Sequence, residues 1–574
     1  MSCCKYASLH TCGSCNSIPS GVLWLMNRHP DSAARGQELV VFAVHNLIAV
    51  ADVRASSIVC TLKAQSGVIT SLSSCYLRQS IAVVAASEDG CILVWKHRYS
   101  SSITEWRLVE QQLTGLLGAV SSSSSCSLQS TSDAFVVAAA DFKGSLLVWH
   151  IISGSSDIDE EPSPMTSIQI ISKIKFPSAQ MAKSIHICEL PTGDSRSPPC
   201  LTIFIGSVDS RIHIYVAKDG IQLPTNGLRS GSTTEAPSHL ELFSCVGILP
   251  GHEEWVVCLA AVAVDCRTTM LASGSQDAKI RVWKIKATKV MDAQGSCGNS
   301  ILEQVTAFDE DDDETDGEQS ADIPAAALTD DDNMDESRLQ FCYCDDILYS
   351  LYLESLLVGH EDWVTALQWM PQVSTQSSGS SSSSAQPLRL FSTSMDRNMV
   401  VWAPDTAAGG IWVPVVRMGD IGGALGGSIG GNLLGFVAGS ISPDCSSVLG
   451  VGYGGSFHLW RSVDSSDYLD TPDTGTERRW IPVPFLTGHF GSVNDLTWSD
   501  REAGEYLVSV SSDQTCRLHA PLADGGTWRE ISRPQIHGYD LNCVAKVCYA
   551  MLYSTCMLSS NALSIIRGCH YYLS

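Results

Sequence analysis

The sequence predicts an all-β fold of the β-propeller class, in which small antiparallel sheets stand as blades around a central axis. Three observations predict it. A phrase of apolar residues, a polar turn and a second apolar stretch recurs along the chain. The copies follow one another at intervals of about 45 to 70 residues, as four-stranded blades with variable loops would, except for one longer gap. Within each copy, apolar residues alternate around turn residues, which is typical of strands joined by hairpins.

The closing position of the phrase holds Trp in five copies and another residue in three. The copies span 39–53, 81–96, 135–150, 201–216, 271–284, 390–403, 448–461 and 506–520, and they close on Ala51, Trp95, Trp149, Tyr215, Trp283, Trp402, Trp460 and His519. Seven copies end by Arg461, so we expect one complete seven-bladed ring and the start of a second, incomplete propeller. Single repeats bury too little core to stand alone. We therefore expect Gly21–Arg28 to supply the outer strand of the last blade and to close the ring without an open edge.

A second signature precedes three of the copies, a Gly-His pair at Gly251-His252, Gly359-His360 and Gly488-His489. A Gly-His phrase followed about 25 to 40 residues later by Asp, five residues and Trp is the mark of the WD40 repeat. The chain resembles this family at these positions. In it, the His, a strand Ser, the turn Asp and the closing Trp form a buried hydrogen-bonded set that locks each blade.

The resemblance assigns blade-locking residues in three copies. They are His252, Ser273, Asp277 and Trp283, then His360, Ser392, Asp396 and Trp402, and in the eighth copy His489, Ser509 and Asp513. A buried His and Asp are tolerable only when every donor and acceptor is paired. Other copies depart from the pattern, with Lys143 or Gly454 at the turn position and His519 in place of Trp. We expect those blades to depend more on apolar packing.

Charge excludes several classes of function. The 574 residues carry 61 Asp and Glu against 36 Lys and Arg, a formal net charge of -25. This balance argues against non-specific nucleic-acid binding and against a polybasic membrane-surface protein. Fourteen of the acids lie between Asp309 and Glu336 without a Lys or Arg, so a disordered acidic insert is expected over about 290–340.

Cysteine usage indicates a reducing compartment. The 22 cysteines are scattered, and the N-terminus has no apolar stretch of the signal-peptide kind. Cys12 and Cys15 form a lone CxxC pair with no second pair at zinc-binding spacing, so no metal site is expected.

The predicted organisation has four parts. Residues 1–19 form a flexible leader, 20–475 the seven-bladed propeller, 476–542 the first blade of a second propeller, and 543–574 a divergent irregular tail. Residues 548–566 lack charges, but Ser, Thr, Asn, Cys and Tyr interrupt them, which favours an irregular tail over a membrane anchor.

No motif of an enzyme is present. We assign no catalytic, cofactor-binding or metal residue, because no His-Glu-x-x-His motif occurs. The glycines of Gly422–Gly435 run into a strand and turn, so they predict a connecting loop and no phosphate cradle. Asp309–Asp313 lacks the ligand spacing of an EF-hand. Trp255 and Trp363, beside the Gly-His pairs, either contact a partner at the rim or pack at the start of a strand.

Several longer phrases resemble one WD40 family in particular, subunit two of the Elongator complex. They occupy 356–369, 391–405, 411–423, 434–444, 457–461, 485–499, 511–522 and 533–543, and the most specific are MDRNMVVW…GIWVP and RPQIHGYDL. The resemblance covers roughly residues 20–542. It implies two seven-bladed propellers in tandem, of which this chain, leaving the pattern after Leu541–Cys543, would carry a truncated second one.

The resemblance also implies a function. The chain would be a non-catalytic scaffold for the Elongator platform subunit and the catalytic radical-SAM/acetyltransferase subunit, which modify the wobble uridine of tRNA by a carboxymethyl-type reaction. The cofactors would belong to the catalytic partner, tRNA contact would be indirect, and the location would be the cytoplasm and nucleus, with no membrane. The alternative is a general WD40 adaptor in signalling or ubiquitin-ligase assembly, capturing peptides at the central opening of the ring.

Overall fold

The structure is a computed structural model. It describes residues 16, 18–26, 38–62, 67–99, 101–102, 104–109, 113, 116, 118–128, 134–152, 167–176, 181–193, 198–217, 242–289, 339–343, 347–371, 388–405, 409–419, 435–453, 455–463, 479–483, 488–489, 493–498, 506–521, 528–536, 540–542, 544–547, 552–556 and 563–567. Over these residues the chain consists of strands and turns, so the predicted all-β propeller class is confirmed.

The first four sheets, which we number as blades in chain order, follow the first four copies of the repeat. Blade 1 contains β1 (Val22–Met26), β2 (Glu38–Val44), β3 (Leu47–Asp52) and β4 (Ser57–Leu62). Blade 2 contains β5 (Ile69–Tyr76), β6 (Ser80–Ser87), β7 (Ile92–Arg98) and β8 (Trp106–Leu108). Blade 3 contains β9 (Val120–Ser127), β10 (Ala134–Asp141), β11 (Ser145–Ile152) and β12 (Ser167–Lys175). Blade 4 contains β13 (Ala182–Leu190), β14 (Cys200–Ser207), β15 (Ile212–Ala217) and β16 (Phe243–Leu249).

The remaining blades follow in the same antiparallel order. Blade 5 contains β17 (Val256–Ala263), β18 (Thr268–Ser275), β19 (Lys279–Lys289), β21 (Ile347–Val358) and, at its edge, β20 (Leu339–Tyr343). Blade 6 contains β22 (Val364–Trp369), β23 (Leu390–Ser394), β24 (Asn398–Asp405) and β25 (Ile411–Gly419). Blade 7 contains β26 (Phe436–Ile441), β27 (Ser447–Gly452), β28 (Phe457–Val463) and β29 (Arg479–Val483). Blade 8 contains β30 (Val493–Trp498), β31 (Leu507–Ser511), β32 (Thr515–Pro521) and β33 (Trp528–Ile536).

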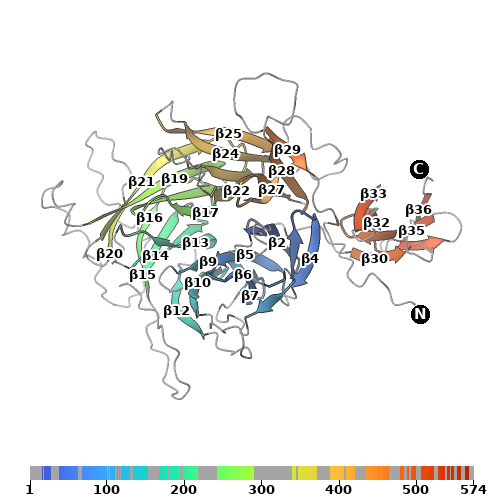
Figure 1. Ribbon diagram of the computed structural model, residues 1–574, viewed down its shortest axis with the longest axis horizontal. Coiled ribbons are helices and arrows are strands. Elements are labelled where there is room, and N and C mark those ends of the chain that lie inside the picture. Colours follow the sequence, from blue (N-terminus) through green and yellow to red (C-terminus); the bar gives the residue numbers. More distant parts are fainter. Residues whose placement is uncertain are drawn as a thin grey trace, which may run out of the picture.

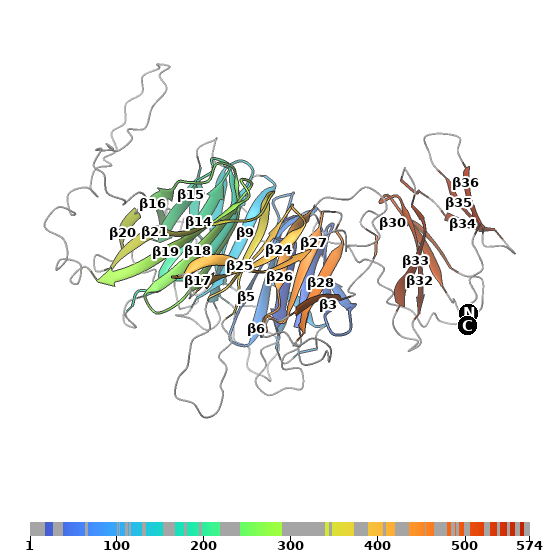
Figure 2. The same cartoon turned by 90° about the horizontal axis from the view of Figure 1, so that it is seen from above.

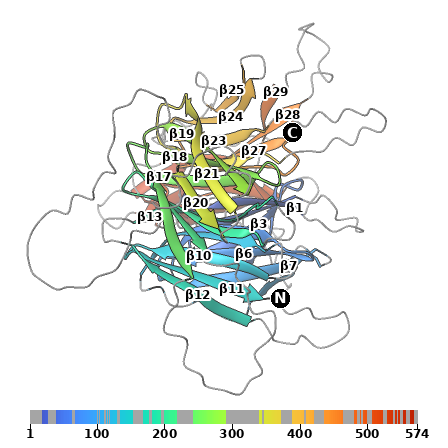
Figure 3. The same ribbon diagram turned by 90° about the vertical axis from the view of Figure 1, so that its left-hand side faces the viewer.

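Blades 1 to 7 stand around a common axis (Figure 1). The first strand of each blade contacts the first strand of the next, and β26 of blade 7 contacts β1 of blade 1. Blade 8 lies beside this ring, as the view from above also shows (Figure 2). From the third direction the sheets of blades 5 to 7 are seen above those of blades 2 and 3 (Figure 3). The ring therefore places the starts of seven first strands around one central opening.

All eight closing residues of the repeat occupy one structural position. Each lies on the third strand of its blade, directly opposite a buried apolar residue of the second strand. The pairs are Val40↔Ala51, Val83↔Trp95, Val137↔Trp149, Ile203↔Tyr215, Leu271↔Trp283, Leu390↔Trp402, Val448↔Trp460 and Leu507↔His519. The weak first copy, closing on Ala51, is thus a true blade.

The ring closes differently from the prediction. Residues 22–26 of the expected outer strand form β1, which pairs with β2 as the innermost strand of blade 1, and blade 7 has its own fourth strand, β29. The prediction that Gly21–Arg28 completes the last blade is therefore wrong. The physical reason is burial, because Val22, Trp24 and Leu25 are buried and need the covered, central position in a sheet.

Apolar side chains join blade 7 to blade 1. Trp24 and Phe42 share a core with Leu449 and Val451. The rings of Phe42 and Phe457 meet edge to face, with centroids 4.8 Å apart. This seam consists of sheet-on-sheet packing, and no strand is exchanged across it.

The long gap in the repeat pattern gives blade 5 its fifth strand. β20 pairs with β21 and packs against blade 4, where Phe341 and Tyr343 join the core around Leu190. The hydroxyl of Tyr343 donates to the Pro199 carbonyl (3.3 Å). Residues 290–338 lie outside the described residues, so the expected disorder of the acidic insert, including Asp309–Asp313, stays a prediction.

Both ends of the chain differ from the expected leader and tail. Within the leader, Asn16 hydrogen-bonds to the carbonyls of His45 and Ile69, and Ile18 packs on the core of blades 1 and 2. The tail expected to be irregular contains a three-stranded sheet of β34 (Val544–Val547), β35 (Leu552–Cys556) and β36 (Leu563–Arg567). β-branched, Leu and Tyr residues favour strands there even without the repeat phrase. Cys12, Cys15 and residues 422–434 lie outside the described part of the chain.

Replacing Phe42 tests the apolar seam. Phe42→Ala removes a fully buried ring between blades 1 and 7 and is expected to lower the free energy of unfolding by about 3–5 kcal/mol. Urea denaturation of the full chain, followed by tryptophan fluorescence, measures this change. Ile531→Ala, on an exposed position of blade 8, is the matched control and should change it by less than about 0.5 kcal/mol. A loss below about 1 kcal/mol for Phe42→Ala would contradict the proposed seam.

Candidate functional site

The blade-locking residues assigned in blade 5 lie together as one hydrogen-bonded chain. His252 Nδ1 lies 2.9 Å from Asp277 Oδ2, and His252 Nε2 lies 2.9 Å from Ser273 Oγ. The indole N–H of Trp283 donates to the same serine oxygen at 3.1 Å. With a neutral imidazole protonated at Nδ1, the indole donates to the serine, the serine to Nε2, and Nδ1–H to the carboxylate. Every donor in this buried set then has an acceptor.

Asp277 also closes the turn and holds the loop before β17. Its oxygens accept the backbone N–H groups of Lys279 (2.9 Å) and Glu253 (3.1 Å). Burial alone would raise the pKa of this carboxyl, but the hydrogen bond from His252 together with the backbone donors lowers it to about 2. The ionised form is therefore the one that the fold stabilises.

Blade 6 repeats this arrangement. His360 lies 2.8 Å from both Asp396 Oδ2 and Ser392 Oγ, and the indole N–H of Trp402 donates to Ser392 at 2.9 Å. The backbone N–H of Glu361 donates to Asp396 at 3.0 Å. Burial opposes ionisation of Asp396 here too, and its pKa is nevertheless lowered, mainly by the His360 hydrogen bond.

Blade 8 keeps the set although His519 replaces Trp. His489 lies 3.0 Å from Asp513 Oδ2 and 2.8 Å from Ser509 Oγ, and His519 Nε2 lies 3.2 Å from the same serine. Burial lowers the pKa of His519 to about 4, so this imidazole is neutral at physiological pH. Arg517, fully buried beside it, pairs with the carboxylate of Glu530 at 2.6 Å. Sequence reasoning missed this ion pair, because no spacing rule links Arg517 to the fourth strand.

Blades without the full motif hold their turns with other residues, which the sequence analysis also missed. In blade 3, Lys143 occupies the motif position, but Asp141 accepts the N–H groups of Lys143 and Ser145 (both 2.9 Å). In blade 4, Asp209 pairs with His213 Nε2 at 2.8 Å, so the histidine comes from the same hairpin. Both aspartates begin a turn directly after a buried strand, which is the signal that identifies them.

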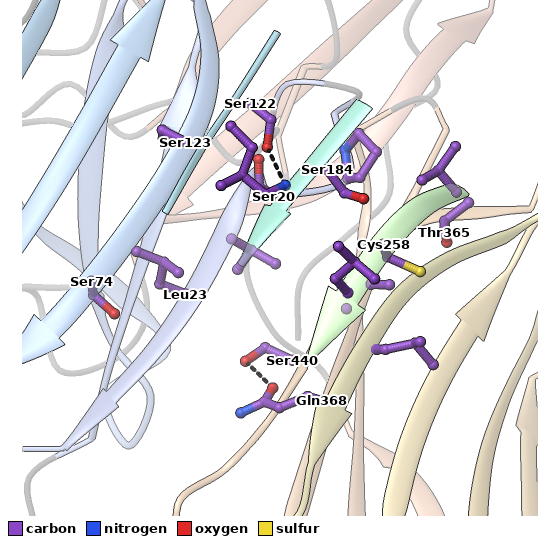
Figure 4. A pocket seen from close by; sticks show the side chains of 18 of the residues that line it. Ser20, Leu23, Ser74, Ser122, Ser123, Ser184, Cys258, Thr365, Gln368 and Ser440 are labelled. Carbon is purple, nitrogen blue, oxygen red and sulfur yellow. Dashed lines mark hydrogen bonds between the residues drawn. The ribbon is translucent and has the colours of Figure 1, made fainter. Parts of the chain in front are cut away.

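The central opening is a channel of about 390 Å³ lined by residues of all seven ring blades. Hydroxyl groups dominate its polar lining, and among the described residues that line it Lys183 is the one charged side chain. Close up, Ser122, Ser184, Thr365 and Ser440 surround it, with Gln368 beside Ser440 (Figure 4).

These hydroxyls connect neighbouring first strands. The contacts that cross from one blade to the next include Ser71 Oγ to Ser123 Oγ (2.8 Å), Ile185 N–H to Ser122 Oγ (3.2 Å), Ser184 Oγ to the Val256 carbonyl (3.1 Å), Thr365 Oγ1 to the Phe436 carbonyl (2.8 Å) and Ser440 Oγ to Gln368 Oε1 (3.0 Å). Two of them are drawn in Figure 4. Polar contacts between neighbouring blades therefore run along the channel wall, and the hydroxyl groups named here have structural partners.

Trp255 and Trp363 lie at the rim of this channel, each immediately before a first strand. Their exposed fractions are 38% and 48%, so neither is packed away at the strand start. The ammonium of Lys183 lies 4.7 Å from the centroid of Trp255 and 5.8 Å from that of Phe142, whose exposed fraction is 49%. The rim therefore presents aromatic surface to solvent, which is typical of protein-binding sites.

Among the described residues, no three His, Cys, Asp or Glu side chains are grouped so that they could hold a metal ion. Nor does the described part of the chain contain a helix with the length and apolar character needed to cross a membrane.

Removing Ser273 tests the polar chain of blade 5. Ser273→Ala leaves the indole N–H of Trp283 and the His252 imidazole without their shared partner, and the free energy of unfolding should fall by about 1–3 kcal/mol. Urea denaturation measures it. Ser102→Ala, on an exposed loop, is the matched control and should leave stability unchanged within about 0.5 kcal/mol. Equal effects of the two variants would show that the buried set does not stabilise the blade.

The pKa of Asp277 makes a prediction about pH. A carboxyl whose pKa is lowered from 3.8 to about 2 on folding adds stability above pH 3.8 and loses it as pH falls towards 2. Asp277→Asn should therefore destabilise the chain by about 1–3 kcal/mol at pH 7, and the gap to the unsubstituted protein should narrow below about pH 4. Denaturation midpoints measured from pH 7 to pH 3.5 test this. A gap that stays constant or widens in acid would disprove the linkage.

Comparison with known families identifies the repeat. The family described as WD domain, G-beta repeat matches residues 243–284 and 480–519. Each match begins in the last strand of one blade (β16 or β29) and runs through the first three strands of the next. One sequence repeat thus spans two blades.

Comparison with curated proteins finds Elongator complex protein 2 from several eukaryotes. The chain is 28% identical to the Arabidopsis thaliana protein over 479 residues, which are 81% of this chain and 47% of that protein. It is 26% identical to the Dictyostelium discoideum protein over 569 residues (92% of this chain, 54% of that protein) and 32% identical to the human protein over 351 residues (60% and 32%). The chain spans about half the length of the first two relatives and a third of the human one. With the repeat matches and the all-β structure, these similarities show that the chain contains WD40 repeats and is similar to Elongator complex protein 2.

Proposed function

We propose that the chain is a non-catalytic scaffold subunit of an Elongator complex. The observation that carries this proposal is the similarity to Elongator complex protein 2, which extends over 81% of the chain for the Arabidopsis relative. The same similarity supports complex membership rather than a free-standing role, because the relatives are named as parts of a complex.

The geometry supports a role in holding other proteins. A closed ring of blades, fixed by buried polar sets and by contacts across the channel wall, keeps its rim loops in defined positions. Rigid presentation lowers the entropy that a partner interface must otherwise lose on binding. Aromatic residues at that rim, such as Trp255 and Trp363, belong to the residue types enriched in protein interfaces.

The proposed partners follow from the family. They are the Elongator platform subunit and the catalytic radical-SAM/acetyltransferase subunit, and the reaction served is carboxymethyl-type modification of wobble uridine in tRNA. The net charge of -25 favours contact with tRNA through these partners over direct binding, because phosphate neutralisation requires a basic surface. From the resemblance to this family we also propose that the chain is located in the cytoplasm and nucleus.

A native pull-down tests complex membership. The full chain, tagged and expressed in its own cells, should co-purify with both the platform and the catalytic subunit, identified by mass spectrometry. Depletion of the chain should lower the carboxymethyl-type wobble nucleosides in digested tRNA, as measured by liquid chromatography and mass spectrometry.

Two outcomes would overturn the proposal. One is the absence of both Elongator subunits from the pull-down. The other is an unchanged level of modified wobble nucleosides after depletion, together with ubiquitin-ligase or kinase subunits among the co-purified proteins. That combination would instead indicate the general adaptor.

A further inference from the structure

The rim of the ring contains an aromatic–cation contact built between three blades. Phe142 stands on the turn of blade 3, Lys183 on the first strand of blade 4, and Trp255 immediately before the first strand of blade 5. The Lys183 ammonium lies 4.7 Å from the Trp255 ring centroid and 5.8 Å from that of Phe142. At these distances the ring faces attract the cation.

The next set of three blades has the same geometry. Trp363 precedes the first strand of blade 6 as Trp255 precedes that of blade 5, and the carbonyl of each accepts a turn N–H (Met395 at 2.9 Å and Gln276 at 3.0 Å). Lys183 and Val257 are both the extra residue at the bulge of a first strand. Val257 therefore occupies in blade 5 the position that Lys183 occupies in blade 4.

The turn residue is also equivalent. The N–H of Phe142 donates to the Ala119 carbonyl (3.0 Å) and that of Val208 to the Met181 carbonyl (3.1 Å), each just before a first strand. Val208 thus corresponds to Phe142. Trp363 consequently has valines where Trp255 has a lysine and a phenylalanine.

Charge at the rim of blade 6 favours a cation from outside. Glu361 and Asp362, next to Trp363, are both exposed. In blade 5 the corresponding Glu253 pairs with Lys279 at 2.6 Å, whereas Asn398 holds the position of Lys279 in blade 6. Arg417 is bound to the Gly359 carbonyl, as Arg281 is to that of Gly251, so this cation is common to both blades.

Besides Arg417, blade 6 has a second cation near its rim, Arg397, which lies on the turn between β23 and β24. Among the described residues no cation or ring lies against the face of Trp363, Arg397 included. We propose that the Trp363 indole, flanked by Glu361 and Asp362, binds a lysine or arginine side chain of a partner protein. The partner's cation would take the place at Trp363 that Lys183 takes at Trp255. This inference does not depend on Elongator membership.

Fluorine NMR of the full chain tests the site with defined probes. The protein is labelled with 5-fluorotryptophan, the Trp363 resonance is assigned from Trp363→Phe, and acetyl-Gly-Arg-Gly-amide is titrated against its citrulline counterpart, a neutral compound of nearly equal shape. The Trp363 resonance should shift saturably, with an affinity at least about three times higher for the arginine peptide, as an exposed cation–π contact with nearby carboxylates would give. Glu361→Gln with Asp362→Asn should weaken arginine binding about twofold or more.

Two variants, one that adds a cation beside Trp363 and one that removes the cation beside Trp255, distinguish the site from general surface binding. Val257→Lys supplies an internal cation and should abolish the response of Trp363. Lys183→Met opens Trp255 and should make a second tryptophan resonance respond. An unmoved Trp363 resonance, an equal response to the citrulline peptide, or unchanged binding by Val257→Lys in a protein with its normal melting temperature would each overturn the proposal.

Discussion

No blade of this protein can cover both of its own faces, and the ring is the arrangement that meets this constraint. Along β2 the side chains alternate, with Leu39, Val41 and Ala43 packing towards blade 2 and Val40 and Phe42 towards blade 7. Second strands are therefore apolar on both faces, as parallel-sheet strands are elsewhere. This explains why the repeat phrase opens with an uninterrupted apolar run. It also explains why blades 7 and 1 pack against each other as other neighbouring blades do. Each blade has a second apolar face, which only the next blade in the ring can cover.

What the sequence predicts well is what lies at fixed spacing within one repeat. The eight closing residues share a register position. In three repeats the Ser and Asp of one hairpin both lie within hydrogen-bonding distance of the upstream His, although the loops between them differ in length. The prediction for the residues of β1 was wrong because the partner of a terminal strand depends on contacts with residues far away in the chain. β20 was missed for the same reason, because it returns to blade 5 after the long acidic segment.

The blades with incomplete motifs show that an acceptor for the turn N–H is a more general requirement of the fold than the His, Ser, Asp and Trp set. In six blades an aspartate accepts the N–H two residues further on in the hairpin turn. The pairs are Asp89 with Cys91, Asp141 with Lys143, Asp209 with Arg211, Asp277 with Lys279, Asp396 with Asn398 and Asp513 with Thr515. Among the described residues, three of these aspartates also accept a hydrogen bond from an upstream histidine. The turn amide must be satisfied in every blade, whereas the histidine is one of several ways to hold the loop before the first strand.

The buried blade-locking residues also hold the rim loops in place. Asp277 accepts both the imidazole of His252 and the backbone N–H of Glu253, and Asp396 does the same for His360 and Glu361. These backbone groups lie two residues before Trp255 and Trp363. The buried set therefore fixes the exposed tryptophans as well as the sheet, and a mutation that unlocks a blade should loosen its rim even when the ring survives. Stability and the proposed recognition are therefore linked through two hydrogen bonds to one carboxylate, and variants of the exposed side chains alone are needed to change one without the other.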